Sequence, residues 1–344
     1  MPKIQPLNPI EGFFIQSQDG LIFDVKGLSH PSDRIIAFVR YIPENFFTGD
    51  MKESRKGYQK IYDLNSRYTF LKENFPNYIF KDTRGRGLLQ GVRVNQISKI
   101  FDPRVRLQEI LNLSNRNLLE EQVSNLTSII LDYSKIDKDA IGISGSILVG
   151  LHTEESDIDI VIYGKKNGQK LYKNMPIIYE KVLGISKYTE KDLEELWKRR
   201  GQTEQIDFSS FCILEKKKLL QGKYNGIDFY IRLVPLPEEF QEDYLNTNLT
   251  YLGEIEIEAI ISDAKDAIFT PCLYQLTEVK IIKSTSMGFI KPKRFFSVRG
   301  RYCELVTEGE NICLKGKLEQ VIIKKDSFYQ ITLGTTKDEF FKLK

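Results

Sequence analysis

At 344 residues, with 41% hydrophobic and 28% charged residues, the chain has the length and composition of a globular protein of two or three domains. The formal net charge of +3 excludes a uniformly basic surface, so any nucleic-acid-binding surface must be a local patch. No apolar run approaches the roughly 20 residues of a membrane span and the first residues do not form a signal peptide, so we expect a cytoplasmic protein.

The first hundred residues predict a β-rich accessory domain over 1–104. Asp19 and Gly20 form a hairpin turn signal between two apolar runs. We expect strands at 13–16, 21–26 and 34–42.

The next segment, 105–245, predicts alternating helices and strands. Apolar residues recur at helical spacing over 105–133 and indicate two helices, with Ser114 as the cap between them. Thr189 and Asp192 form a near-capping box at the start of a later helix. We expect strands at 140–144, 157–163 and 226–234, and helices at 146–151, 170–182, 189–200 and 208–220.

The last segment, 246–344, returns to a β pattern interrupted by glycines, which is typical of a small, OB-like barrel or a sandwich. We expect its strands at 254–261, 274–282, 295–305, 312–323 and 327–333. The whole chain is therefore predicted to be an α+β protein, with a central domain between two β-rich ones.

The cysteines and histidines limit the metal chemistry that this chain supports. Its four cysteines lie far apart without a C-x-x-C pair, and it has only two histidines. Any metal must therefore be held by carboxylates, which favours Mg²⁺ or Mn²⁺ over zinc.

Two aspartates interrupt the apolar strand at 157–163. Residues i and i+2 of a strand point to one face, so Asp157 and Asp159 project together. Two carboxylates this close repel each other unless a cation lies between them. The alternative is that both face solvent at the end of the strand.

A second strand, at 226–234, places Asp228 and Arg232 on one face. If this strand is a neighbour of the first, Asp228 joins Asp157 and Asp159, and three carboxylates are enough for two metal ions and an in-line displacement at phosphorus. Arg232 on the same face contacts a phosphate or balances the acids.

Gly145 and Ser146 lie between a predicted strand and a predicted helix. Glycine permits close approach of the backbone, the helix N-terminus offers N–H groups, and the serine adds a hydroxyl, so the pair suits a triphosphate. The chain contains neither a Walker loop nor a dinucleotide-binding G-x-G-x-x-G. The alternative is a tight turn without a ligand.

The combination of Gly145-Ser146 with the Asp157-x-Asp159 motif and a later strand aspartate resembles the DNA polymerase β-like nucleotidyltransferase superfamily. The chain also resembles a group of predicted archaeal nucleotidyltransferases through segments such as "GSILVGLHTEESDIDIVIYG".

The superfamily resemblance covers roughly residues 105–240 and implies a mixed sheet with helices. It implies that Gly145 and Ser146 hold the nucleotide phosphates, that Asp157 and Asp159 bind both metals, and that Asp228 helps to bind the catalytic metal and to orient or deprotonate the attacking hydroxyl. Basic residues are expected near the triphosphate, with Arg200, Lys216 and Arg232 as candidates, although Arg200 and Lys216 also fit a solvated face or a charge at a helix terminus.

The resemblance predicts a Mg²⁺- or Mn²⁺-dependent enzyme that transfers a nucleoside monophosphate from an NTP, such as ATP, to a hydroxyl and releases pyrophosphate. Arg294, Arg299 and Arg301 are interleaved with Phe295 and Phe296, a composition that suits single-stranded RNA or a tRNA-like acceptor and equally an alternating strand with buried phenylalanines and exposed arginines. An RNA 3′ end is the first choice of acceptor. The alternatives are a small molecule, a protein side chain, or a non-catalytic binding or antitoxin module.

Overall fold

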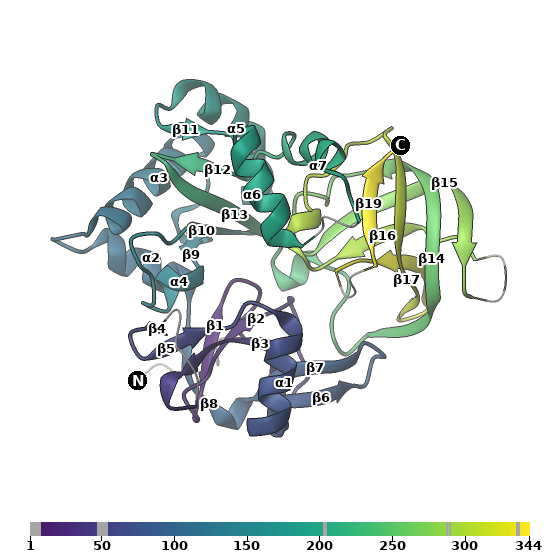
Figure 1. Ribbon diagram of the computed structural model, residues 1–344, viewed down its shortest axis with the longest axis horizontal. Coiled ribbons are helices and arrows are strands. Elements are labelled where there is room, and N and C mark those ends of the chain that lie inside the picture. The colour runs from purple at the N-terminus through teal and green to yellow at the C-terminus, as the bar shows by residue number, and fades with distance from the viewer. Residues whose placement is uncertain (1–7, 47–53, 202–204, 287, 289, 335–337) are drawn as a thin grey trace.

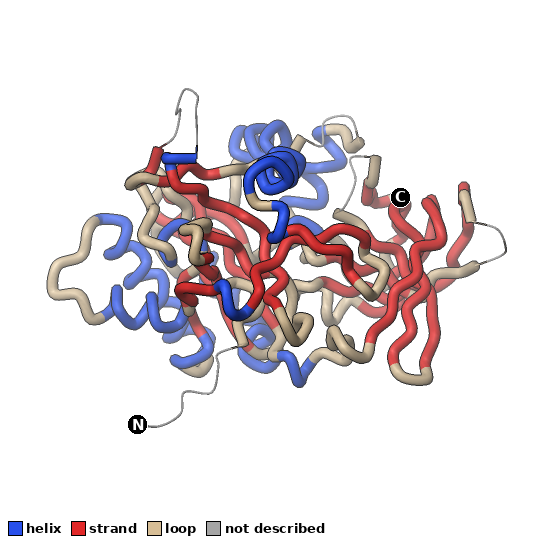
Figure 2. Tube along the Cα trace, turned by 90° about the horizontal axis from the view of Figure 1, so that it is seen from below, coloured by secondary structure: helices blue, strands red, loops and turns tan. Residues whose placement is uncertain are grey.

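The protein is described by a computed structural model that covers residues 8–46, 54–201, 205–286, 288, 290–334 and 338–344. These residues form three β-sheets and seven α-helices (Figure 1). The C-terminal sheet lies at one end of the long axis and α3 (Leu118–Ser134) at the other (Figures 1 and 2). No helix within the described ranges combines the length and the apolar character needed to cross a bilayer.

The N-terminal sheet has the strand order β4-β5-β3-β2-β1-β8, and β7 joins β3 to β6. The three predicted strands are confirmed to within about one residue, but the helix α1 was not expected. Asp63 caps the N-terminus of α1, and its carboxylate accepts a hydrogen bond from the backbone N–H of Ser66 at 2.8 Å. The elements are β1 (Phe14–Ser17), β2 (Ile22–Val25), β3 (Arg34–Pro43), β4 (Ser54–Arg55), β5 (Tyr58–Lys60), α1 (Leu64–Asn74), β6 (Ile79–Asp82), β7 (Gly87–Arg93) and β8 (Ile97–Phe101).

The central sheet has the order β11-β12-β13-β10-β9, and its two longest strands, β10 and β13, are parallel neighbours. Helices α2, α3 and α5 pack their apolar residues against one face of this sheet. The elements are α2 (Pro103–Leu111), α3, β9 (Ile141–Ile143), α4 (Gly145–Leu148), β10 (Ile158–Tyr163), α5 (Lys165–Lys181), β11 (Ile185–Ser186), α6 (Glu190–Arg200), α7 (Phe208–Glu215), β12 (Gln221–Tyr224) and β13 (Ile227–Val234).

Several predicted helix boundaries in this region are wrong: α5 begins at Lys165 and not at 170, and α4 ends at Leu148 and not at 151. Helix α3 is capped by Asn117 and not by Ser114, because Glu120 stands three residues after Asn117 and completes a reciprocal capping box. Helix α7 ends at Glu215 instead of continuing to 220, because the chain turns there into β12, an unpredicted strand that forms a hairpin with β13.

The two faces of β10 pack against different parts of the chain. Ile158, Ile160 and Ile162 belong to the core under the helices. Val161 and Tyr163 belong instead to the core of the N-terminal sheet, where the rings of Tyr163 and Phe13 lie 6.1 Å apart. The N-terminal sheet therefore covers the same face of β10 that carries Asp159.

The C-terminal strands pair in a closed circuit, β14-β15-β16-β18-β17 and back to β14, and β19 is added to β17. Strand β14 bends at Gly253, where φ is +132° and the register shifts. The strands are β14 (Thr247–Asp263), β15 (Cys272–Ser284), β16 (Arg294–Ser297), β17 (Asn311–Ile323), β18 (Asp326–Thr332) and β19 (Phe340–Leu343). The five predicted strands are present with changed bounds, and β19 was not predicted.

Three of the residues considered for a nucleic-acid platform, Arg294, Phe295 and Phe296, are buried. The exposed fractions of Phe295 and Phe296 are 0% and 4%. Arg294 is buried too, where its guanidinium contacts the carboxylate of Glu242 at 2.5 Å and the side-chain oxygen of Gln330. The buried phenylalanines of the alternative are therefore confirmed, but Arg294 is buried and not exposed as that alternative expected, and the two rings cannot stack on bases.

The substitution Phe295→Ala is expected to lower the free energy of unfolding by about 3–5 kcal/mol, because removal of a fully buried ring leaves a cavity. Urea denaturation measures this change. As a control, Tyr251→Ala removes an aromatic side chain that is 51% exposed on the same sheet, and the free energy should change by less than about 0.5 kcal/mol. A loss of RNA affinity without a loss of stability in Phe295→Ala would contradict the burial of this ring.

Candidate active site

A cavity of about 200 Å³ lies between the central sheet and the N-terminal sheet. Four of its lining residues, Gly145, Ser146, Asp157 and Asp159, were predicted as a site from the sequence, and Arg232 was predicted to share their face. The remaining lining residues are Gly12, Phe14, Asp24, Arg40, Tyr41, Lys60, Ser144, Ile160, Val161 and Tyr230.

Gly145 begins α4 and cannot carry a side chain. Its φ is +64°, and a Cβ atom built on it would lie 2.1 Å from Oδ2 of Asp159. The preceding residue, Ser144, donates its backbone N–H to the carbonyl of Asp159 at 2.7 Å and its hydroxyl to the carbonyl of Gly12 at 2.7 Å. The turn thus brings the backbone against the carboxylate of Asp159.

Ser146 follows in the first turn of α4 and is only 3% exposed. Its Oγ is buried and has no hydrogen-bond partner among the described residues. An unpaired buried hydroxyl costs about 1–3 kcal/mol. A phosphate oxygen or a hydrated cation in the cavity would satisfy this hydroxyl.

The acid pair lies at the start of β10. Asp157 immediately precedes the strand and is exposed, while Asp159 is on the strand and half-buried. Burial raises the pKa of Asp159 to about 7, the negative charge of Asp157 adds to the rise, and Arg232, Lys60 and Arg40 oppose it. Without a cation, the site therefore favours a proton on Asp159 near neutral pH.

Asp228 lies beside Asp157 on the neighbouring strand. Phe229 pairs with Ile158 in the parallel register, so one step back along both strands brings Asp228 next to Asp157. Burial raises the pKa of Asp228, and Asp157 contributes to the rise. Its carboxylate Oδ1 lies 3.7 Å from Nζ of Lys223, and it does not line the cavity.

The residues present fit a divalent metal ion held by Asp157 and Asp159. Carboxylate oxygens are the ligands that Mg²⁺ and Mn²⁺ prefer, and a cation would relieve the repulsion within the pair. In the described part of the chain, however, no three His, Cys, Asp or Glu side chains form a cluster that could hold a metal. Asp228 would have to turn away from Lys223 to become a third ligand.

Arg232 is the predicted basic residue that the fold brings to the cavity. It forms an ion pair with Glu11 of the N-terminal segment, whose side chain is 1% exposed. The positive charge of Arg232 also lowers the pKa of Asp24 and opposes the rise at Asp159. Arg232 thus borders the cavity and balances its acids.

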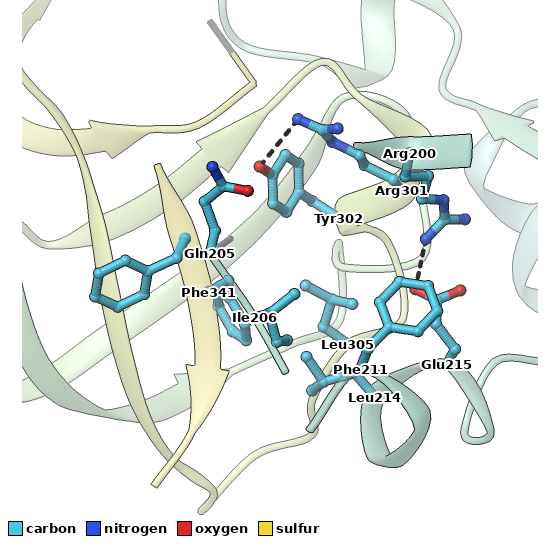
Figure 3. A pocket seen from close by; sticks show the side chains of 11 residues that line it. Arg200, Gln205, Ile206, Phe211, Leu214, Glu215, Arg301, Tyr302, Leu305 and Phe341 are labelled. Atoms are coloured by element: carbon cyan, nitrogen blue, oxygen red, sulfur yellow. Dashed lines mark hydrogen bonds and ion pairs between the residues drawn. The ribbon is translucent and has the colours of Figure 1, made fainter. Parts of the chain in front are cut away.

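The two other predicted basic residues lie elsewhere. Arg200 contacts the buried carboxylate of Glu215 at 2.7 Å and lines a separate cavity of about 20 Å³ beside Arg301, room for about one water (Figure 3). Lys216 is exposed at the end of α7, where its carbonyl accepts a hydrogen bond from Lys187. The structure therefore does not bring Arg200 or Lys216 to the acid pair.

Three charged side chains of the cavity, Asp24, Arg40 and Lys60, were missed in the sequence. Asp24 is a single charge within a short apolar strand, the same signal that identified Asp228, whereas Arg40 is one of two arginines in the ten-residue strand β3. Lys60 ends a three-residue strand that shows no such pattern. All three come from the segment expected to be only an accessory.

Comparison with known proteins agrees with the geometry of the central sheet. Residues 123–236 match the family model described as "Nucleotidyltransferase domain". This segment is a nucleotidyltransferase domain. It includes Gly145, Ser146, Asp157, Asp159 and Asp228, so the predicted superfamily is confirmed.

One relative extends the similarity beyond this nucleotidyltransferase domain. An uncharacterized protein of Methanocaldococcus jannaschii is 28% identical over 341 residues, which cover 95% of this chain and 96% of the relative. The expected similarity to archaeal proteins is therefore confirmed over nearly the whole chain. No solved structure matches the chain.

The raised pKa of Asp159 predicts a pH-dependent loss of stability. Between about pH 4 and pH 7 the folded protein keeps a proton that the unfolded chain releases, so Asp159 lowers the free energy of unfolding as pH rises through this range. In metal-free buffer, Asp159→Asn should be more stable than the wild type above pH 7, and the difference should shrink toward pH 4. Denaturation at a series of pH values measures it.

Two controls complete this test. Asp326→Asn changes an exposed aspartate far along the chain and should leave the pH dependence unchanged. Added Mg²⁺ should stabilise the wild type more than Asp159→Asn, because a ligand that binds only the folded state raises its stability. Identical pH curves for the wild type and Asp159→Asn would refute the proposed environment of this carboxyl.

Proposed function

We propose that the protein is a metal-dependent nucleotidyltransferase that transfers a nucleoside monophosphate from an NTP to a hydroxyl group and releases pyrophosphate. The observation that carries the proposal is that the acid pair, Asp157 and Asp159, lines one cavity together with Gly145 and Ser146 within a nucleotidyltransferase domain.

Five residues of the cavity have distinct tasks in this reaction. Asp157 and Asp159 hold the Mg²⁺ or Mn²⁺, which when bound neutralises charge on the phosphate oxygens. Gly145 lets the backbone approach the triphosphate, and Ser146 donates its hydroxyl proton in a hydrogen bond to a phosphate oxygen. Arg232, fixed by Glu11, offsets the negative charge of the substrate.

Asp228 accepts the proton of the attacking hydroxyl. Its position beside Asp157 puts it at the edge of the acid pair, and its raised pKa makes it a stronger base than an ordinary aspartate. Lys223, 3.7 Å away in the structure, stabilises the ionised form until the substrate binds.

An RNA 3′ end is the first choice of acceptor. The closed five-strand circuit of the C-terminal sheet supports an OB-like barrel, a class of fold that binds single-stranded nucleic acids. Arg299 is an exposed cation just after β16, and it is available for phosphate contacts.

A second candidate is transfer to a hydroxyl of a small molecule or of a protein. The burial of Phe295 and Phe296 favours it, because it removes the aromatic platform on which bases would stack. Incubating the protein with each labelled NTP, Mg²⁺ or Mn²⁺, and total cellular RNA separates the two acceptors. Label in RNA supports the first candidate, label in small molecules or protein supports the second, and no transfer contradicts both.

The acid pair yields the first kinetic prediction. Asp157→Asn and Asp159→Asn should each reduce the rate of transfer by a hundredfold or more, about 3 kcal/mol in the barrier, because each removes a metal ligand. Steady-state turnover with Mg²⁺ measures this loss, and Asp326→Asn is the control. Normal turnover in both variants would place the metal site elsewhere.

Asp228 yields a different prediction, because it acts on the acceptor more than on the nucleotide. Asp228→Ala should bind Mg²⁺·NTP within a few-fold of the wild-type affinity and yet transfer almost nothing. Titration with a fluorescent NTP beside a turnover assay measures both quantities. Complete loss of nucleotide binding would show that Asp228 has a structural role instead.

A further inference from the structure

The cavity of the nucleotidyltransferase domain is completed by the N-terminal sheet. Arg40 of β3 and Lys60 of β5 line it from the side opposite the acid pair, and we call these two residues the cationic wall. The two residues lie on neighbouring strands, since Tyr41 of β3 pairs with Lys60 of β5. A part of the chain outside residues 123–236 thus contributes directly to the site.

The cationic wall is held in place by a local network around Ile61 and Tyr62. The guanidinium groups of Arg40 and Arg67 both donate to the carbonyl of Ile61 at 3.2 Å. The charged ends of Arg40 and Lys60 lie 5.1 Å and 4.9 Å from the centre of the Tyr62 ring. A guanidinium has five N–H donors, so the hydrogen bond to the carbonyl of Ile61 leaves other N–H groups of Arg40 that can bind an anion.

Three contacts fix the N-terminal sheet over the Gly145-Ser146 turn. Lys56 donates to the carbonyl of Gly150 at 2.9 Å, just beyond α4. Ser144 donates its hydroxyl to the carbonyl of Gly12. Glu11 pairs with Arg232 on β13. The cationic wall therefore has a fixed position relative to the phosphate-binding turn.

The cavity is lined by equal numbers of acidic and basic side chains. Its lining carries three carboxylates, Asp24, Asp157 and Asp159, and three cations, the cationic wall and Arg232. Asp24 contacts Lys26 at 2.8 Å, and Arg232 is paired with Glu11, so these charges are partnered outside the cavity. The side facing the acid pair is therefore positive, and arginine binds phosphate through paired N–H donors.

We propose that Arg40 and Lys60 bind the polyphosphate chain of the nucleoside triphosphate, so that the N-terminal sheet is part of the nucleotide site and not an accessory. This inference rests on the proposed function. It assigns phosphate recognition to a sheet that lies outside the nucleotidyltransferase domain.

The test compares the binding of a fluorescent NTP, NDP and NMP of the same base in buffer containing EDTA, so that the result does not depend on metal. Lys60→Met keeps the apolar stem over Tyr62 and removes the charge, and Arg40→Ala removes the guanidinium. Each variant should bind NTP at least tenfold more weakly than the wild type and NMP within about twofold, because only the polyphosphate meets the cationic wall.

Two matched controls lie on the same sheet and outside the cavity. Lys99→Met removes an exposed lysine whose ammonium also lies over an aromatic ring, 4.5 Å from the centre of Phe101. Arg93→Ala removes an exposed arginine. Both should bind all three nucleotides as the wild type does, and thermal melting of all four variants reports whether they are folded.

The outcomes separate the inference from the function on which it rests. If the wild type binds NTP and transfers nucleotide with Mg²⁺ while both cavity variants bind NTP normally, the cationic wall is refuted and the function stands. Equal losses for NTP and NMP in a folded variant also refute it, because the contact is then not with the polyphosphate. If the wild type binds no NTP and transfers none, the proposed function fails and the inference fails with it.

Discussion

Strand β10 is buried on both faces by different partners, and the geometry of the site depends on this double burial. Its isoleucines pack under α3 and α5, and on the other face Val161 and Tyr163 pack against the N-terminal sheet. Only the start of that second face remains open, and Asp159 stands there. The strand cannot slip by one residue, because a slip would exchange apolar and acidic side chains between the two faces.

The central part of the site was predictable because its signals are local. Gly145, Ser146, Asp157 and Asp159 lie within fifteen residues, and both the strand period and the glycine turn can be read from the sequence. The position of Asp228 beside Asp157 follows from a parallel register that the sequence does not contain. Arg40 and Lys60 were missed for a similar reason, because packing between two sheets leaves no periodic signal.

The strands of the C-terminal sheet were predicted more reliably than the orientation of their side chains. Phe295 and Arg294 alternate in a way that fits either a surface platform or a buried strand, and both side chains proved to be buried. The ion pair of Arg294 with Glu242 explains the burial of Arg294, since a cation is buried only with a partner of opposite charge. Such a partner, 52 positions away, cannot be identified from a strand pattern.

The ion pair between Glu11 and Arg232 joins residues that are 221 positions apart, which has a consequence for synthesis of the chain. The N-terminal sheet ends with β8, so all of its strands are synthesised before β13. In the interval before β13 is made, the carboxylate of Glu11 still has two partners. Nζ of Lys26 lies 3.0 Å from it, and the backbone N–H of Gly27 donates a hydrogen bond to it at 2.9 Å. Lys26 can therefore supply the counter-charge of Glu11 until Arg232 has been synthesised and has come into contact with it.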